Sequence, residues 1–330
     1  MNHLEHYPRH KHGEKLIVVL DPSTMANTNC LRHYEFQNLM GLTPKAVDHK
    51  LEYGQAVHIA IANHYNGMKV RDALNTAMAY FMGSTSDPGT DYRNEMHLMK
   101  CINEYFIKYS GDSYVPYRNS NGRLAVEMPF LIPWKSTEYF DVLIGGVVDT
   151  FGKHAGRENI VKDVKTTSLW DVDKFFDKYR YNIQMVMYAY AIKWYAKLKS
   201  YPLVMIDGIF LQASGKPAKY QRSGMIDMDN GIVDDQLHWL SMQIDTLMKA
   251  LTAAVEGEHN PFPRNPTCCE SVFGACQYKK LCWGFEKEKE IVFPAFMQRI
   301  YDPSKFGEVP QVWTNTNNGT LLKYLQTYES

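Results

Sequence analysis

The chain of 330 residues lacks any apolar run that approaches the roughly 20 residues required by a membrane-spanning helix. It also lacks a net charge, because 36 basic residues balance 36 acidic ones and the pI is near 7.2. A protein that coats nucleic acid through its overall field carries an excess of basic charge. The composition therefore predicts no membrane association, and it restricts any contact with nucleic acid to local patches.

The sequence has no hydrophobic signal segment, no internal repeat and no low-complexity linker. Residues 1–15 are polar and rich in histidine, so we expect a cytoplasmic protein in a reducing compartment. We expect a flexible segment at 1–20, a single domain at 21–285 and a tail at 286–330. The domain is expected to have a helical part to about residue 120, a core to about 260 and a cysteine segment to 285.

The hydrophobic periodicity predicts an α/β fold in which a small mixed sheet is flanked by helices. We expect a long helix from Trp170 to Lys199 and further helices at 24–39, 46–66, 70–82, 95–109 and 232–256. Strands are expected at 124–132, 140–151, 159–166, 204–212 and 218–228.

The pattern with the most chemical content is Asp149 followed by Asp163-Val164-Lys165. Asp149 closes one apolar strand and Asp163 lies in the next, with a Gly- and Lys-containing turn between them, so both carboxylates can meet at one end of a sheet. Residues two apart in a strand share a face, which places Lys165 beside Asp163. Two acids and a lysine predict a divalent-metal site in which the lysine ammonium can bind a phosphate. An exposed, solvated hairpin would show the same triplet.

Two helices and one strand carry further candidates. Gly54 and His58 lie one turn apart on a helix, so a backbone can approach closely while His58 offers a nitrogen to a metal, unless it is a core histidine. Gln184 and Tyr188 share a face at i,i+4 but are also compatible with an ordinary helix surface. Glu127, within an apolar strand, is either a further carboxylate acting through a water or a partner in a salt bridge.

Cysteine spacing is a sharper signal. Four of the six cysteines, Cys268, Cys269, Cys276 and Cys282, crowd into one segment rich in Pro, Gly and aromatic residues. Three thiolates in a compact loop need a fourth ligand to complete a tetrahedral zinc site or an iron-sulfur cubane, and Cys30 is the natural candidate. Disulfides are not expected in a reducing compartment. Zinc, and Cys268 in place of Cys269, stay open as alternatives.

The ordered set of Gly54 and His58, Asp149, Asp163 and Lys165, Gln184 and Tyr188, bracketed by one early and three late cysteines, resembles the PD-(D/E)xK nucleases of the RecB-like branch. It is most similar to the iron-sulfur members of that branch, such as the AddAB nuclease domain, CRISPR-associated adaptation exonucleases and phage-encoded relatives. The resemblance spans about residues 20 to 285. It departs from the family at Cys30, which is followed by Leu31-Arg32 where the family usually has Pro-Arg.

The resemblance implies a restriction-endonuclease-like core with an N-terminal helical elaboration and a C-terminal cysteine segment. It implies a Mg- or Mn-dependent deoxyribonuclease of the exonuclease type, with the metal held by His58, Asp149, Asp163 and the Val164 carbonyl. Gln184 and Tyr188 would position the DNA backbone. Such a protein acts in recombination, repair or phage DNA processing, in a bacterium or a phage-infected cell, and a helicase or recombinase as partner is left open.

The same resemblance implies a [4Fe-4S] cluster held by Cys30, Cys269, Cys276 and Cys282. Candidate contacts to DNA, single- or double-stranded, are Arg32 and the patch Lys216, Lys219 and Arg222, where cations are interleaved with an aromatic residue. Each such patch is also typical of a solvated turn. The competing interpretation is a noncatalytic DNA-binding or assembly module that keeps the nuclease fold and the metal bound by the cysteines.

Overall fold

The computed structural model describes residues 11–12, 15–45, 48–83, 91–119, 122–169, 171–212, 216–228, 230–271 and 274–298. These residues form two compact units, each assembled from separate stretches of sequence: unit 1 within 1–46, 131–146 and 234–319, and unit 2 within 47–130 and 147–233. Two long strands, β5 (Val126–Ser136) and β6 (Phe140–His154), contribute residues to both units. The single domain expected for 21–285 stays a prediction.

Unit 2 contains three helices that pack together, α3 (His49–Tyr65), α4 (Val70–Gly83) and α5 (Glu95–Lys108). Asp48 and Asn94 accept hydrogen bonds from backbone N–H groups in the first turns of α3 and α5, so these caps fix where the two helices begin. Apolar side chains of the three helices share one core with Val164 and Ile209 of the sheet. The helices expected in this part of the sequence are confirmed to within a few residues.

The strands of unit 2 form a mixed sheet. β7 (Arg157–Thr167) runs antiparallel to β6 and parallel to β8 (Leu203–Phe210), while β9 (Lys219–Arg222) is antiparallel to β8. The short strand β4 (Val115–Pro116) pairs with the end of β6. The β6–β7 hairpin turns at Ala155 and Gly156, which both have positive φ. The hairpin predicted between Asp149 and Asp163 is therefore confirmed.

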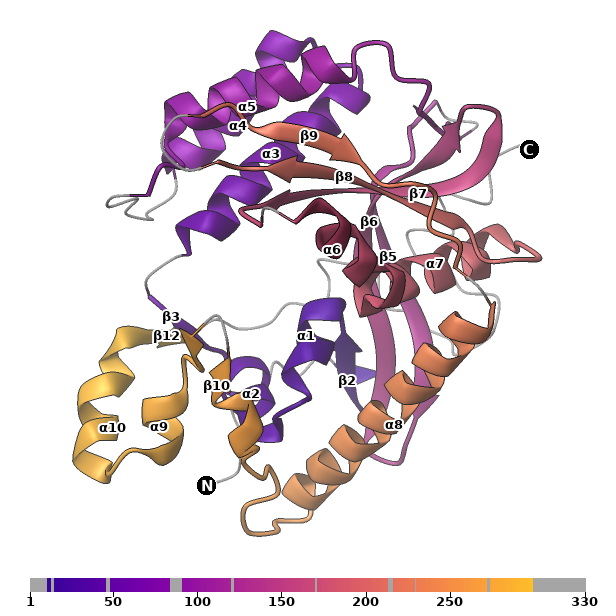
Figure 1. The fold of residues 1–330 in the computed structure, drawn as a ribbon. Helices are drawn as coiled ribbons and strands as arrows, with labels where there is room; N and C mark the ends of the chain where they lie inside the picture. The colour runs from indigo at the N-terminus through magenta and orange to yellow at the C-terminus, as the bar shows by residue number, and fades with distance from the viewer. Residues whose placement is uncertain are drawn as a thin grey trace. The chain divides into compact units, whose positions relative to one another are not determined.

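Helices cover both faces of this part of the sheet (Figure 1). Ile209 of β8 packs into the core formed with α3, α4 and α5. Its neighbour Gly208 faces the other way, toward α6 (Val172–Asp177), where a Cβ would lie 3.0 Å from the Phe175 ring and 3.1 Å from the Phe176 ring. The mixed α/β fold with a sheet flanked by helices is as predicted from the sequence.

The single helix expected from Trp170 to Lys199 is wrong, and Trp170 itself lies outside the described residues. The segment forms α6, a 3₁₀ turn (Lys178–Tyr181) and α7 (Ile183–Ala196). The break occurs at Asn182, which has extended backbone angles and whose side chain accepts a hydrogen bond from the Gln184 N–H. An asparagine cap competes with helix continuation, so α7 begins anew just before Gln184.

Unit 1 contains the N-terminal segment, the long helix α8 (Asn230–Val255), whose first residues belong to unit 2, and the cysteine segment. Its other elements are β1 (Lys11–His12), β2 (Lys15–Leu20), α1 (Pro22–Asn27), α2 (Leu31–Tyr34), a π-helix (Glu35–Leu39), β3 (Leu42–Pro44), two 3₁₀ turns (Pro266–Cys268 and Phe293–Ala295), β10 (Glu270–Ser271), β11 (Gly274–Ala275), α9 (Lys279–Trp283), α10 (Glu286–Val292) and β12 (Phe296–Gln298). No described helix combines the length and the apolar character needed to cross a membrane.

Three expectations for unit 1 need correction. The stretch Lys15–Leu20 is not flexible, because it forms a strand that pairs in parallel with residues 140–144 of β6. The helix expected at 24–39 is interrupted at Cys30, whose φ of −134° and ψ of 104° are extended. The expected tail continues into α10 and β12, and β12 pairs with β3. The interruption leaves Cys30 at the N-terminal end of α2.

Candidate active site

Three side chains from three elements of unit 2 converge on one point. His58 of α3, Glu127 of β5 and Asp149 of β6 each offer a ligand atom, and these atoms lie within 4.8 Å of one another. His58 Nδ1 is 3.1 Å from Asp149 Oδ2. The structure thus brings together an imidazole and two carboxylates that are far apart in the sequence.

The neighbouring strand supplies the next two groups. Asp163 and Lys165 are two residues apart on β7, and Lys165 Nζ lies 2.9 Å from Asp163 Oδ2. Asp163 is fully buried, whereas the Lys165 side chain keeps 21% of its surface exposed. The Val164 N–H donates a hydrogen bond to Asp149 Oδ2 at 3.2 Å, which ties β7 to the carboxylate of β6. The backbone N–H between Asp163 and Lys165 therefore helps to fix Asp149.

A cleft of about 600 Å³ opens onto His58, Glu127, Asp149 and Lys165, while Asp163 lies buried behind it. Its lining consists of residues from α3, Tyr80 of α4 and the polar groups of the strands and α7: Gln55, His58, Ile59, Ala62, Asn63, Asn66, Tyr80, Glu127, Asp149, Lys165 and Gln184. The Gln184 amide donates to the Tyr188 hydroxyl at 2.7 Å, one turn along α7. Tyr188 is buried and packs edge-on against Phe130, so it anchors Gln184 at the wall of the cleft.

The charged groups of the site shift one another's pKa values. Burial alone would lower the pKa of His58, but the charge and the hydrogen bond of Asp149 outweigh it and raise the pKa to about 9. Burial alone would raise the pKa of Asp149, but His58 and Lys165 hold the pKa of this carboxyl below its usual range. Asp149 is therefore ionised at neutral pH and stands beside a protonated imidazole.

The pKa values of the other two carboxyls, Asp163 and Glu127, shift in the opposite direction. Burial, followed by the negative charge of Asp149, raises the pKa of Asp163 to about 7 despite the opposing charge of Lys165. Glu127 remains accessible from the cleft, but the surrounding protein partly desolvates its carboxylate. This desolvation, followed by the negative charge of Asp149, raises the pKa of Glu127 to about 7. The site thus holds more negative charge than its own cations neutralise at alkaline pH.

Glu127 reaches the site through an uncommon backbone conformation. Its φ is +48°, in the left-handed region that non-glycine residues seldom adopt and that costs on the order of 1 kcal/mol or more. The sequence shows an acidic residue between two apolar ones, Val126 and Met128, but no periodicity in it indicates this conformation. The sequence therefore left two interpretations of Glu127 open: a carboxylate at the site, or a partner in a salt bridge.

A family model supplies independent information on this arrangement. The model of the PD-(D/E)XK nuclease superfamily matches residues 26–283, a range that contains the cleft, its acidic groups and the four late cysteines. The chain belongs to this superfamily. A comparison with curated protein sequences found no match.

Enzymes of the PD-(D/E)XK superfamily use divalent metals, and the donor set of the cleft fits such an ion. Carboxylate oxygens are the preferred ligands of Mg²⁺ and Mn²⁺, and imidazole is compatible with the softer of the two. Asp149 and Glu127 offer oxygens beside His58, and the raised pKa of Asp163 indicates a carboxylate that lacks full compensation by protein charges. A divalent cation bound here would compensate that charge.

Binding of Mn²⁺ at pH 7 is expected to release about two protons, because Glu127 and Asp163 are each about half protonated there, and His58 carries a full proton that it must lose to bind a cation. The release should fall to about half a proton near pH 9, where only His58 is still partly protonated, and the apparent affinity should rise with pH over the same range. Isothermal titration calorimetry in buffers of different ionisation enthalpy measures the protons. In a Glu127→Gln variant about three quarters of the release should remain; an unchanged release would exclude Glu127 from the site.

Unit 1 carries a second cluster of metal-ligating side chains. Five cysteines, Cys30, Cys268, Cys269, Cys276 and Cys282, line one small cavity, and all five are free thiols. His33 contributes a ring nitrogen 3.7 Å from Cys276 Sγ. Burial and the neighbouring thiols raise the pKa of Cys276. The fold therefore brings the early cysteine to the late ones, as their spacing requires if they share a metal.

Arg32, an expected DNA contact, lies in unit 1 and is hydrogen-bonded to Glu35 and Asn260. It lines a depression of about 490 Å³ together with His259 and Arg264, while Arg264 also stacks over the Trp283 ring at 4.8 Å. Sequence reasoning missed His259 and Arg264, because only folding brings this segment beside α2. No local pattern marks either residue.

The other expected DNA contacts lie in unit 2 and differ in their environment. Lys216, just before β9, and Lys219, the first residue of β9, are both exposed. Arg222 is instead held by two carboxylates, with Nε 2.5 Å from Asp207 Oδ1 and Nη2 2.7 Å from Asp112 Oδ2. These bidentate contacts engage the guanidinium on both sides. We therefore keep the two lysines as proposed phosphate contacts and assign Arg222 a role in the fold.

Proposed function

We propose that this nuclease of the PD-(D/E)XK superfamily is a Mg²⁺- or Mn²⁺-dependent deoxyribonuclease of the RecB-like type, acting as an exonuclease. The observation that supports it best is the convergence of His58, Glu127 and Asp149 on one point beside Asp163 and Lys165. The choice of DNA ends over internal sites rests on the ordered motif set that resembles the RecB-like branch. A role in recombination, repair or phage DNA processing, with or without a helicase or recombinase, rests on the same resemblance.

In this proposal the metal is held by Asp149, Asp163, His58 and the Val164 carbonyl, with Glu127 beside them. Bound there, a divalent cation supplies a more acidic water and neutralises charge on the phosphate. Hydrolysis needs a water oxygen to attack phosphorus in line while the opposite P–O bond breaks, and negative charge grows on the phosphoryl oxygens. The pKa of Lys165 is raised, because Asp163 and Asp149 outweigh its burial, so its ammonium stays charged to meet that growth.

Gln184 is proposed to position the DNA backbone. Its side-chain nitrogen is held by the Tyr188 hydroxyl, and the residue lines the same cleft as Lys165. A side chain fixed in this way orients a phosphate at little further entropic cost. Tyr188, which is buried, supports Gln184 and is proposed to act through it.

The test uses two forms of one DNA, a linear duplex with labelled ends and a closed circle, incubated with Mg²⁺, Mn²⁺ or EDTA. We expect loss of the end label from the linear DNA with either metal and an intact circle. Nicking of the circle would replace the exonuclease by an endonuclease. DNA that is bound but left whole with both metals would favour a noncatalytic module and overturn the proposed function.

We propose that a [4Fe-4S] cluster occupies the cysteine cavity. Four thiolates on one zinc ion, at about 2.3 Å each, stand about 3.8 Å from one another. Within the described part of the chain, His58, Glu127 and Asp149 form the one group of three metal-ligating residues whose atoms lie within 4.8 Å. The cysteine sulfurs of the described residues form no group that compact, and the choice of a cubane, whose separate iron atoms each take one thiolate, rests on the resemblance to the iron-sulfur members of the RecB-like branch.

The contacts of the two adjacent cysteines favour Cys269 as the ligand. Both sulfurs lie near a backbone carbonyl, at 3.5 Å for Cys268 and 3.8 Å for Cys269. Cys269 in addition accepts a hydrogen bond from the indole N–H of Trp283 at 3.2 Å. Such N–H donors stabilise a thiolate and tune the potential of an iron-sulfur cluster. We therefore propose Cys30, Cys269, Cys276 and Cys282 as the ligands.

A further inference from the structure

One face of α3 is attached to β7 at two points. Gly54, His58 and Tyr65 fall within about 40° of one another around the helix axis, so all three belong to this face. At Gly54 a Cβ would lie 3.4 Å from the Thr166 Oγ1, which is the close approach that a glycine permits. Near the end of the helix, Lys162 Nζ donates a hydrogen bond to the Tyr65 hydroxyl. His58 therefore lies between two contacts of the helix with the same strand.

The contact at Lys162 involves a buried charge. The Lys162 side chain has no exposed surface, and its Nζ lies 3.5 Å from Asp207 Oδ2. The same atom lies 4.5 Å from the centre of the Tyr65 ring and 4.4 Å from that of the Tyr114 ring. Burial, only partly offset by the charge of Asp207, lowers the pKa of Lys162 to about 8. Burying this ammonium thus costs free energy.

The stability of the fold does not require this lysine. Arg222 already pairs with Asp207, with its Nε 2.5 Å from Oδ1 and its Nη2 2.9 Å from Oδ2. The Tyr105 hydroxyl donates a further hydrogen bond to Asp207 Oδ2 at 2.8 Å. A buried ion pair is often no more stable than apolar side chains of similar volume. A lysine at position 162 is therefore better explained by the elements that it joins than by the stability that it adds.

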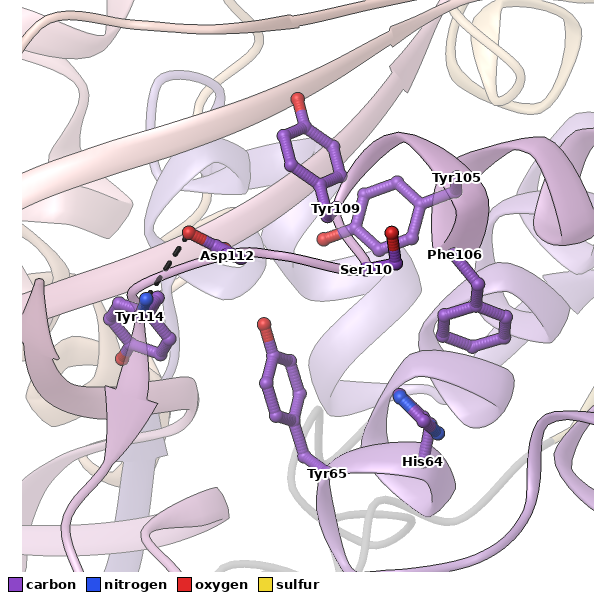
Figure 2. A pocket seen from close by; sticks show the side chains of 8 residues that line it. All are labelled: His64, Tyr65, Tyr105, Phe106, Tyr109, Ser110, Asp112 and Tyr114. Carbon is purple, nitrogen blue, oxygen red and sulfur yellow. Dashed lines mark hydrogen bonds between the residues drawn. The ribbon is translucent and has the colours of Figure 1, made fainter.

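The Lys162 ammonium joins α3 to the strand of Asp149. Figure 2 shows Tyr65 at the end of α3 and Tyr114 on the segment just before β4, and the ammonium contacts both rings. The Tyr114 hydroxyl donates to Thr150 Oγ1 at 3.0 Å, and this hydroxyl in turn donates to the Lys162 carbonyl at 3.0 Å. Thr150 directly follows Asp149 on β6. The helix that carries the imidazole is thus tied to the strand that carries the carboxylate.

We propose that Lys162 is a positioning residue of the metal centre, which fixes the end of α3 through Tyr65 so that His58 meets Asp149. The inference rests on the proposed metal-dependent nuclease function and adds to it the group that places the imidazole ligand. Lys162 touches neither the metal nor the DNA in this proposal. Replacing a residue that orients a metal ligand typically weakens metal binding about ten- to hundred-fold.

The test measures the dissociation constant of Mn²⁺ at pH 7.5 from the EPR signal of the free ion, and the melting temperature in EDTA. Lys162→Met should raise the dissociation constant about ten-fold. Its melting temperature should stay the same or rise, because methionine fills the space without a buried charge. Tyr65→Phe, which removes only the hydroxyl, should weaken binding less. Lys153→Met, at an exposed lysine of β6, is the control and should match the wild type in both measurements.

A double-mutant cycle distinguishes the positioning of His58 from a general disturbance of the site. If Lys162 acts through His58, adding Lys162→Met to a protein that already carries His58→Ala should leave the dissociation constant unchanged. Two losses that add would overturn the proposal, as would wild-type affinity in Lys162→Met alone. If Lys162→Met is unfolded, the same cycle with Tyr65→Phe decides the matter.

The outcomes also separate this proposal from the proposed function. If the cycle gives the expected result but the wild-type protein with Mn²⁺ leaves DNA whole, the nuclease function is wrong and the role of Lys162 stands. If DNA is cut and His58→Ala weakens Mn²⁺ binding but Lys162→Met does not, the positioning role is wrong and the nuclease stands. An unchanged dissociation constant in His58→Ala would remove His58 from the metal site and the positioning role with it.

Discussion

Replacing Asp163 with asparagine is expected to lower the rate of DNA cleavage by about 100- to 1000-fold or more, since it removes a metal ligand and a charge that acts in the transition state. The same change should not lower the melting temperature of the metal-free protein at pH 8. Burial and the charge of Asp149 raise the pKa of Asp163 above its unfolded value of 3.8 to about 7, so stability is lost as the pH rises between these two values and the full cost is present at pH 8. Asparagine removes that cost.

The measurement pairs single-turnover cleavage with thermal unfolding in EDTA at pH 6 and pH 8. Asp173→Asn, at an exposed position in the first turn of α6, is the matched control and should change neither quantity. Cleavage by Asp163→Asn at a rate near that of the wild type would remove Asp163 from the site. A large fall in melting temperature would show instead that the lost activity reflects unfolding, and Lys165→Ala would then carry the test.

Replacing Cys269 with serine is expected to remove most of the bound iron and to destabilise unit 1 by several kcal/mol, because metal binding and folding are coupled where the ligands come from distant segments. The matched change at the adjacent position, Cys268→Ser, should leave the metal content and the melting temperature unchanged. Wild-type protein purified without oxygen should be brown and contain about four iron and four sulfide per chain. Iron and acid-labile sulfide analysis, with thermal unfolding, measures all three proteins.

Colourless wild-type protein with one zinc per chain would contradict the cluster and leave the nuclease proposal intact. If Cys268→Ser rather than Cys269→Ser loses the metal, the ligand set is wrong at that position alone. Because the cysteine cavity lies in unit 1 and the catalytic cleft in unit 2, DNA cleavage in these variants should fall only as far as the folded fraction falls.

The sequence predicted what depends on short-range periodicity. The alternation along 159–166 places Asp163 and Lys165 on one face, and the β6–β7 hairpin brings that face to Asp149. Prediction from the sequence failed where one side chain overrides the periodic pattern, as at Asn182, whose side chain caps α7 and so starts a new helix there. The apolar run of β2 was overlooked because the preceding polar segment suggested flexibility.

Other features could not be predicted because no local signal encodes them. The approach of Cys30 to the late cysteines depends on the path of the whole of unit 1, and spacing indicated only that a fourth ligand was needed. The burial of Lys162 is a second example, because the strand pattern shows one more charged residue there, whereas the structure buries its ammonium between tyrosines and Asp207. Burial of a charge follows from its partners, and partners from distant segments are not visible in a linear pattern.

The backbone of Glu127 has a consequence for protein engineering. A residue held at φ +48° is a standard target for thermostabilisation, because glycine or asparagine adopts that conformation at lower cost. A design procedure that scores folding alone would make this replacement early and would remove a carboxylate from the catalytic cleft. Under the proposed nuclease function, any stabilised version of this chain has to exclude position 127 from redesign and seek its gains elsewhere, for example on the exposed surface of α8.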